Sequence, residues 1–270
     1  MPEAPGPGSD GPGKIDILSA PRESAFPDEW YALSDAGHFW FRWRLAATLR
    51  LLRDLGIPLA APLRCLEIGS GAGILRDQLE VATGWTVDIC DLNLEALRRA
   101  RSGRGRILYY DVTEESLGAA YDVVLAFDVI EHLESVRPFL SAAVAHLRPG
   151  GHLLINVPAL QWLYSVYDET VGHVRRYDRL TLAREAEGLD LEVREVRYWG
   201  FAFVPLLMLR KALLRARARQ PGNVIRTGFR PPGGLANALL SGLVHVESAL
   251  VGGHPPLGSS VMLAGRRPAP

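Results

Sequence analysis

The stretch Arg64-Cys65-Leu66-Glu67-Ile68-Gly69-Ser70-Gly71-Ala72-Gly73 decides the fold of this chain. A short apolar run that ends at Glu67, followed by three alternating glycines, predicts a strand, a tight turn and the start of a helix. Glycine adopts positive φ, and without a Cβ it lets the backbone come close to a ligand. The helix that follows begins with unpaired amide groups. The stretch therefore predicts a nucleotide site, and an ordinary strand–turn–helix is the alternative.

Short apolar runs alternate with amphipathic segments on both sides of this turn. The runs predict seven strands, over residues 64–68, 85–91, 106–111, 121–127, 151–157, 191–198 and 260–264. The segments between them predict helices over residues 73–82, 94–101, 136–147 and 180–186. Strands that alternate with helices imply right-handed crossovers. We therefore predict an α/β fold with a doubly wound, mostly parallel sheet.

Other segments flank or interrupt this pattern. Residues 1–29 are rich in Pro and Gly and predict a disordered tail, whereas residues 30–58 predict an aromatic-rich helical lid. The core covers residues 59–200 and contains a long aromatic and charged loop at 159–178, a length that suggests function. Residues 201–258 predict a helical cap with two helical runs, at 203–219 and 235–251, and residues 259–270 hold the last strand and a tail.

The composition narrows the class of protein. Thirty basic and thirty acidic side chains give a net charge of zero, so no overall field attracts nucleic acid. Cys65 and Cys90 lie in apolar runs and predict buried free thiols in a reducing compartment. The chain shows no secretory signal, no membrane-length apolar segment and no metal-ligand spacing. We expect a soluble cytoplasmic protein without a metal, with peripheral membrane contact through the basic end of the 203–219 helix as a secondary option.

Carboxylates stand at the ends of further predicted strands. Asp91 closes the second strand, Asp111 closes the third, and the fourth ends in Phe127-Asp128-Val129-Ile130-Glu131-His132. Open α/β sheets bind ligands at the carboxyl edge, where all these residues would lie. Each acid alone is explained equally well as a helix N-cap. Several acids in register favour a ligand site.

The nucleotide is not expected to be NAD. Asp91 can accept both ribose hydroxyls, which does not separate NAD from other nucleotides. The dinucleotide spacing, however, requires glycine at position 74, where this chain has Ile74. The chain also lacks a Tyr-x-x-x-Lys pair. These features disfavour an NAD-dependent oxidoreductase.

The successive motifs resemble those of class I S-adenosylmethionine-dependent methyltransferases, and within them the methyltransferase 11/23-type and ubiquinone/menaquinone-biosynthesis-type groups. The resemblance covers about residues 63–157 and rests on the glycine turn, Asp91, Asp111, Tyr121-Asp122-Val123-Val124, Glu131-His132-Leu133 and Leu147-Arg148-Pro149-Gly150-Gly151. It implies a Rossmann-like sheet with an antiparallel last strand, which residues 260–264 would supply. It also implies S-adenosyl-L-methionine as cofactor.

The same resemblance assigns roles to residues. Glu67, Gly69 and Gly71 would approach the methionine moiety, and Asp91 would hold the ribose. Asp111 with Val112 would lie at the adenine, and Phe127 with Asp128 would border the amino-acid part and the methyl group. The full expected cofactor set is Glu67, Gly69, Ser70, Gly71, Gly73, Asp91, Leu92, Asp111, Val112, Phe127 and Asp128.

The acceptor would meet the methyl group near the fourth and fifth strands. The candidate catalytic residues are Asp128, His132 and His173, because a base is needed only when the acceptor atom arrives protonated. The candidate substrate-binding residues are Trp40, Trp162, Tyr164, Asp168, Arg175, Arg176 and Tyr177. The arginines suit an anionic acceptor. The alternatives are a capping or core role for His132, and pairing of an arginine with Asp168 or Glu169 that fixes the loop.

The lid segment raises a further expectation. Arg42 or Arg44 would meet the carboxylate of the cofactor, whereas Phe39, Phe41 and Trp43 are expected to serve packing. Tyr31 and His38 are weaker candidates for the site.

Taken together, the sequence predicts a methyltransferase that acts on a small hydrophobic or amphipathic acceptor, with an anionic group as an option. Such an enzyme would serve the biosynthesis of a natural product, quinone, lipid or glycan. One alternative is an S-adenosylmethionine-using enzyme with non-methyl chemistry. Another is a non-catalytic cofactor-binding domain, against which the intact glycine turn, Asp91 and Asp111 argue.

Overall fold

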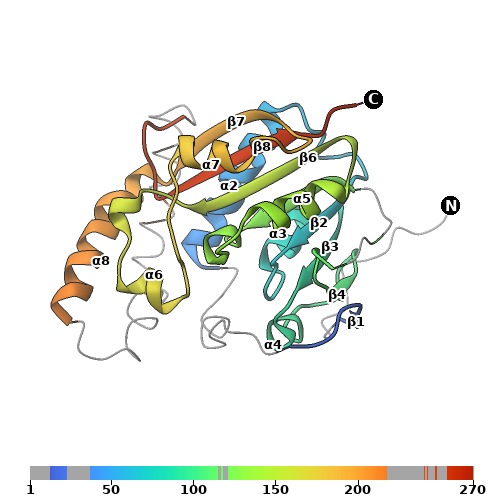
Figure 1. The fold of residues 1–270 in the computed structure, drawn as a ribbon, viewed down its shortest axis with the longest axis horizontal. Helices are drawn as coiled ribbons and strands as arrows, with labels where there is room; N and C mark the ends of the chain where they lie inside the picture. Colours follow the sequence, from blue (N-terminus) through green and yellow to red (C-terminus); the bar gives the residue numbers. More distant parts are fainter. Residues whose placement is uncertain are drawn as a thin grey trace.

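The fold is described from a computed structural model, in which residues 13–22, 37–114, 117, 121–217, 240, 242, 247 and 254–269 are described. Eight strands form one sheet (Figure 1). The strands are β1 (Ile15–Ile17), β2 (Arg64–Ile68), β3 (Thr86–Asp91), β4 (Ile107–Tyr109), β5 (Tyr121–Phe127), β6 (Leu147–Pro158), β7 (Glu192–Trp199) and β8 (Ser260–Arg266). The α-helices are α2 (Phe39–Asp54), α3 (Ile74–Ala82), α4 (Leu94–Leu97), α5 (Arg137–Ala145), α6 (Val166–Thr170), α7 (Arg179–Glu185) and α8 (Val204–Arg217). Three short 3₁₀ helices complete the described elements: η1 (Ile130–His132), η2 (Gln161–Leu163) and η3 (Phe201–Phe203).

The strand order confirms the predicted doubly wound sheet. The order is β1-β4-β3-β2-β5-β6-β8-β7, with β2 at the centre between β3 and β5. All neighbouring pairs from β1 to β6 are parallel. β8 lies between β6 and β7 and is antiparallel to both, as the resemblance predicted for the last strand. The glycine turn therefore leaves the carboxyl end of a central strand, beside the reversal of strand order where such sheets bind ligands.

The predicted number of strands was one too low. β1 lies within the segment that the sequence predicts to be disordered, and it pairs in parallel with β4 at the edge of the sheet. A strand of three residues is too short to show an alternating pattern, so its position depends on the partner strand. The prediction of a disordered tail is wrong for this strand.

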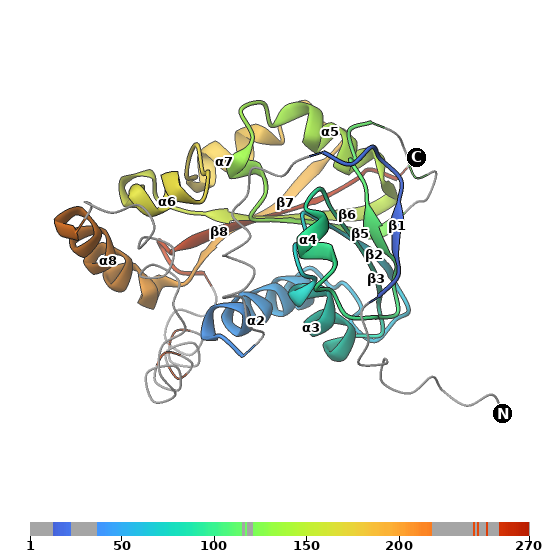
Figure 2. The same cartoon turned by 90° about the horizontal axis from the view of Figure 1, so that it is seen from below.

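Helices cover both faces of the sheet (Figure 2). α2 and α3 lie on one face, where Phe39, Trp43, Leu75 and Leu79 belong to one buried apolar cluster. α5 and α7 lie on the other, where their apolar side chains belong to a second cluster. The two helical layers bury β2 and β5 on both faces, as the continuous apolar sequence of these strands requires.

The predicted helical lid contains α2. This helix starts after His38, whose Nδ1 accepts a hydrogen bond from the Trp40 amide at 3.1 Å, and residues 30–36 lie outside the described residues. Phe39, Phe41 and Trp43 are buried, and Phe39 and Phe41 also line the cavity described below. Tyr31 lies outside the described residues.

The two interruptions of the core meet beside the sheet. The 159–178 loop contains η2 and α6, and α8 lies next to α6 (Figures 1 and 2). The guanidinium of Arg210 stacks on the Tyr167 ring, with 4.2 Å between its Cζ and the ring centroid. The second predicted helical run lies outside the described residues, apart from three positions. In the described part of the chain, no helix is long and apolar enough to cross a membrane.

Candidate active site

The glycine turn has the conformation that its sequence predicts. Gly69, Gly71 and Gly73 all have positive φ, of 70°, 55° and 72°. A Cβ on Gly69 would lie 2.3 Å from Cγ2 of Val129, so a larger residue cannot fit there without displacing the Val129 side chain. The first glycine is therefore required both by the backbone angle and by the contact with Val129.

The amide groups of this turn are held by the neighbouring strand. The amides of Gly69 and Ser70 both donate to the carbonyl oxygen of Cys90, at 2.9 and 3.1 Å. The amide of Gly71 donates to Oδ2 of Asp91 at 2.7 Å, and Oδ1 of Asp91 accepts from the Asn93 amide at 2.7 Å. These hydrogen bonds hold the backbone of the turn against β3 and Asn93. Burial raises the pKa of Asp91 above its usual value, although these amides act in the opposite direction.

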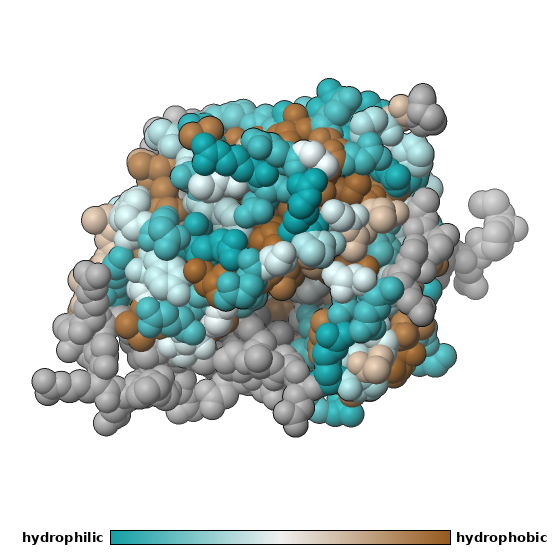
Figure 3. All heavy atoms as spheres, in the orientation of Figure 1, coloured by the Kyte–Doolittle hydropathy of each residue, from teal (hydrophilic) through white to brown (hydrophobic). Residues whose placement is uncertain are grey.

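A cavity of about 610 Å³ opens beside this turn, a volume in the range of small-molecule sites. Figure 3 shows that the face seen in Figure 1 is hollowed near its middle, where both hydrophobic and hydrophilic atoms border the hollow. The cavity runs from the glycine turn to the loop after β5, and on to the 159–178 loop and α8. It therefore joins the predicted cofactor end to the predicted acceptor end.

Most of the expected cofactor residues line this cavity. They are Glu67, Gly69, Ser70, Gly71, Asp91, Leu92, Phe127 and Asp128. Gly73, Asp111 and Val112 are not among its lining residues. The side chain of Asp111 instead pairs with Arg22, whose Nη2 lies 2.8 Å from Oδ2. Gly73 is the N-terminal cap residue of α3 and packs near Ile89.

The floor of the cofactor end carries a buried carboxyl. Glu67 is 3% exposed, and its Oε2 has no hydrogen-bond partner in the described structure. Burial raises the pKa of Glu67 to about 7, although the charges of Arg44 and Arg76 act in the opposite direction. A positively charged ligand group beside this carboxyl would favour its ionised form.

The lid helix contributes a cation to the same end of the cavity. Nη1 of Arg44 lies 2.8 Å from Oδ2 of Asp128, and Arg44 lines the cavity, whereas Arg42 is exposed. Asp128 has a φ of 58°, and its Oδ1 accepts a hydrogen bond from Nδ2 of Asn156 at 2.7 Å. These two contacts fix the carboxylate of Asp128 in place. The positive φ of Asp128 is uncommon for a residue other than glycine.

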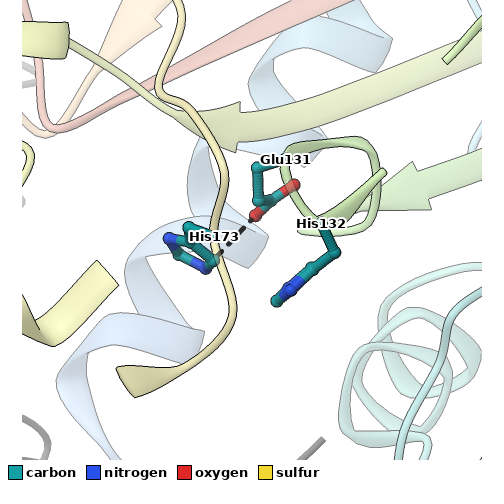
Figure 4. A group of neighbouring side chains, drawn as sticks. All are labelled: Glu131, His132 and His173. Carbon is teal, nitrogen blue, oxygen red and sulfur yellow. Dashed lines mark ion pairs between the residues drawn. The ribbon is translucent and has the colours of Figure 1, made fainter. Parts of the chain in front are cut away.

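At the other end of the cavity, three side chains form the cluster Glu131, His132 and His173 (Figure 4). Oε1 of Glu131 lies 3.8 Å from Nε2 of His173, and the two imidazole rings are 4.8 Å apart. Burial, with the charge of Asp128, raises the pKa of Glu131 well above its usual value. Burial, with His173 beside it, lowers the pKa of His132 to about 4, so this ring is neutral at pH 7. The structure thus brings both predicted catalytic histidines together.

Asp168 holds the 159–178 loop in place. It is fully buried and accepts hydrogen bonds from Nε of Arg176 at 2.7 Å and from Nδ1 of His173 at 3.1 Å. Burial alone raises a carboxyl pKa, but the bond from His173 and the charge of Arg176 hold the pKa of Asp168 well below its ordinary value. Arg176 lines the cavity, yet its charge is already paired. The geometry of this pair matches the alternative in which an arginine fixes the loop.

Of the remaining predicted substrate residues, one lines the cavity and four do not. Trp40 lines the cavity, whereas Trp162, Tyr164, Arg175 and Tyr177 are not among its lining residues. Nη2 of Arg175 donates to the carbonyls of Leu133 and Glu134, which ties the loop to the end of η1. Tyr177 is buried in the core, and Trp162 is 51% exposed.

Several lining residues were not selected from the sequence: Glu131, Tyr167, Phe203, Leu207 and Arg210. Glu131 stands beside His132 in the quoted motif, so the sequence alone could have indicated it as a site residue. The others come from α6, η3 and α8, whose place over the sheet depends on tertiary packing.

Comparisons with known proteins identify the family of this chain. A family model described as a methyltransferase domain matches residues 34–196, which is more than half of the chain. The ubiquinone biosynthesis O-methyltransferase of Paramagnetospirillum magneticum is 36% identical over 114 residues, covering 38% of this chain and 45% of that enzyme. The chain thus matches less than half the length of this relative.

Solved structures share the fold. Phosphoethanolamine N-methyltransferase 2 of Haemonchus contortus, in complex with S-adenosyl-L-methionine, is 19% identical with a TM-score of 0.53, covering 82% of this chain and 52% of that one. The N-methyltransferase NodS of Bradyrhizobium japonicum, in complex with S-adenosyl-L-homocysteine, is 17% identical with a TM-score of 0.50, covering 84% and 87%. The family match, the turn and the cavity together show that this chain belongs to the methyltransferase-domain family, within the class I S-adenosylmethionine-dependent methyltransferases.

Proposed function

We propose that this protein transfers the methyl group of S-adenosylmethionine to a hydroxyl oxygen of a small apolar acceptor. The observation that carries the proposal is the single cavity that connects the glycine turn with the Glu131–His132–His173 cluster. A donor bound at the turn and an acceptor bound at the cluster would share one cavity. Alignment of the two reactants can supply up to about 7–11 kcal/mol of rate acceleration in favourable models.

The wall of the cavity supports an apolar acceptor. Trp40, Phe203 and Leu207 line it, and the rings of Trp40 and Phe203 lie 5.8 Å apart. Arg176 is engaged by Asp168, and Arg175 is turned toward the end of η1, so neither arginine supports an anionic acceptor. An aromatic or otherwise apolar molecule fits this surface best.

The polar groups support a hydroxyl as the methylated group. A hydroxyl must lose its proton when it becomes an ether, and Glu131, His132 and His173 are groups that accept protons or stabilise the oxygen that remains. The matched relative is an O-methyltransferase of ubiquinone biosynthesis, which agrees with this choice.

A direct assay tests this function. Purified protein is incubated with S-adenosylmethionine and with matched sets of apolar phenols, amines and carboxylic acids, and products are followed by mass spectrometry. We expect a gain of one methyl group on phenols, and the reaction without S-adenosylmethionine serves as the blank. Methylation confined to amines or acids would replace the proposed acceptor class. Cofactor binding with no methyl transfer to any set would favour non-methyl chemistry or a binding domain.

The affinity for S-adenosylmethionine is expected to rise by about tenfold between pH 5.5 and pH 7.5. Glu67 has a pKa of about 7, so its carboxyl is mostly neutral at the lower pH and mostly ionised at the higher one. The ammonium group of the methionine moiety, which we expect near Glu67, favours the ionised form. Binding therefore strengthens as pH rises through the pKa of Glu67.

Calorimetric titration at several pH values measures this effect. The Glu67→Gln variant cannot ionise and should show a nearly flat profile over the same range. Folding raises the pKa of Glu67 from 4.5 to about 7, so the folded protein holds this proton more tightly than the unfolded chain does. The resulting contribution to the free energy of unfolding is complete below pH 4.5 and is lost as pH rises to about 7. Equal pH profiles for the two proteins would show that Glu67 does not face the cofactor.

A further inference from the structure

The 159–178 loop places a histidine in direct contact with a buried carboxylate at the acceptor end of the cavity. Nδ1 of His173 lies 3.1 Å from Oδ1 of Asp168. An ionised carboxylate oxygen only accepts hydrogen bonds, so Nδ1 of His173 carries the proton and donates it. The neutral ring therefore has its lone pair on Nε2. The carboxylate of Asp168 thus fixes both the tautomer and the orientation of this imidazole.

Asp168 is held in one position and keeps its negative charge. Oδ1 of Asp168 accepts from His173 and from Nε of Arg176, and Oδ2 accepts from the amide and the hydroxyl of Ser165. Burial raises the pKa of a carboxyl, but the bond from His173 and the charge of Arg176 hold the pKa of Asp168 well below its usual range. A fixed negative charge beside an imidazole stabilises the imidazolium that forms when the ring takes a second proton.

The second ring nitrogen of His173 is left for a ligand. His173 lines the cavity, and its side chain is 13% exposed. Nε2 lies 3.8 Å from Oε1 of Glu131, which is longer than a hydrogen bond (Figure 4). Among the described residues, Nε2 of His173 therefore makes no hydrogen bond, and its lone pair is available to a molecule in the cavity.

We propose that His173 is the general base that takes the proton of the acceptor hydroxyl, and that Asp168 is the residue that positions it. This inference rests on the proposed transfer of a methyl group to a hydroxyl oxygen. In this arrangement the carboxylate holds one nitrogen of the histidine and leaves the other to the reacting group. His173 would touch the acceptor, whereas Asp168 would act only through His173.

The other two members of the cluster are less suited to this role. Nδ1 of His132 lies 3.1 Å from the carbonyl oxygen of Gly172, which carries no full charge to stabilise an imidazolium. Burial, with His173 beside it, lowers the pKa of His132 to about 4, so this ring binds a proton weakly. Burial, with the charge of Asp128, raises the pKa of Glu131 well above its usual value, which favours the protonated acid. A protonated carboxyl cannot take the proton of the acceptor.

The proton and the methyl group move in opposite directions from the acceptor oxygen. Nε2 of His173 takes the proton of the hydroxyl, and the oxygen forms a bond to the methyl carbon. The carbon–sulfur bond breaks, and its electron pair stays on sulfur. The products are the methyl ether, S-adenosylhomocysteine and an imidazolium ion whose charge Asp168 stabilises. The imidazolium then releases its proton to solvent.

Phenols that differ in acidity test the role of His173. The direct assay identifies a phenol that the unmodified protein methylates, and a nitro-substituted form of the same phenol is largely ionised at the assay pH. An ionised phenol has no proton to lose, so its methylation needs no base. His173→Gln should lower kcat for the parent phenol by at least about 100-fold, which is a typical contribution of a general base. The loss for the nitro-substituted form should stay below about tenfold.

The same comparison separates a positioning role of Asp168 from a structural one. Asp168→Asn keeps the size of the side chain and removes its charge, so it should also impair the parent phenol much more than the nitro-substituted one. A structural role alone would lower both rates to the same extent. His254→Asn changes an exposed histidine that does not line the cavity, and it should keep both rates. Calorimetric titration with S-adenosylmethionine checks that each variant still folds.

Other outcomes separate the explanations. An unchanged rate in His173→Gln, or equal losses for the two phenols, would overturn the role of His173 and leave the proposed function intact. If a variant does not fold, nitrogen NMR of the unmodified protein decides. The ring of His173 is expected to carry its proton on Nδ1, and a proton on Nε2 instead would contradict the proposal. Failure of the unmodified protein to methylate any phenol would refute the proposed function, and this role with it.

Discussion

Replacing Asp91 by alanine is expected to weaken binding of S-adenosylmethionine by about 100-fold. Both carboxylate oxygens already accept one amide hydrogen bond each, from Gly71 and Asn93, and each has a further lone pair for a ribose hydroxyl. Hydrogen bonds to a charged acceptor contribute about 1.5–3 kcal/mol each. Loss of the two bonds to the ribose, about 3 kcal/mol together, corresponds to two orders of magnitude in the dissociation constant.

The matched control is Asp122→Ala. Asp122 also accepts an amide hydrogen bond, from Arg64 at 2.7 Å, but it lies near the start of β5, at the opposite edge of the sheet. Calorimetric titration of both variants compares the loss of a carboxylate at the two edges. We expect near-normal affinity for the control. Unchanged affinity in Asp91→Ala would refute the ribose role of that residue.

The sheet was predictable because most of its strands are apolar runs that can be recognised in the sequence without knowledge of their partners. β2 and β5 begin and end at the residues that the apolar runs predict, since both are buried on two faces by helices. β1 was not predictable, because its three residues depend on pairing with β4. The start of α2 carries little signal in the sequence, because His38 caps this helix through a ring nitrogen instead of one of the usual capping side chains.

Site residues at the end of a single strand could be predicted from the sequence. Residues whose partners come from a distant segment of the chain could not. Asp91 and Gly69 line the cavity, as their positions at the end of β3 and directly after β2 imply. Asp111 has the same kind of position, but Arg22 from the N-terminal segment engages it. Arg175 and Arg176 are neighbours in sequence, yet one ties the loop to η1 and the other pairs with Asp168. Pairings of this kind are decided by tertiary contacts that one sequence does not reveal.

The second large effect concerns the contribution of the 159–178 loop to the stability of the protein. Asp168→Ala is expected to lower the free energy of unfolding by about 3–5 kcal/mol, because it leaves a buried arginine without its counter-charge. The carboxylate also accepts hydrogen bonds from His173 and from the amide of Ser165, at 3.1 and 2.9 Å. The guanidinium of Arg176 would retain the carbonyl of Ala159, at 3.1 Å, as its hydrogen-bond partner, which does not compensate for the charge. Denaturant unfolding measures the difference.

Asp178→Ala provides the matched control for this loss. Asp178 is exposed and caps α7 by accepting a hydrogen bond from the Thr181 amide at 2.8 Å, so its removal should cost about 1 kcal/mol. The double variant Asp168→Ala, Arg176→Met then separates the two causes of instability. Removing both charges should recover a large part of the stability, because no unpaired buried charge remains. Equal losses in Asp168→Ala and Asp178→Ala would mean that the ion pair with Arg176 does not hold this loop, and that the position of His173 depends on other contacts.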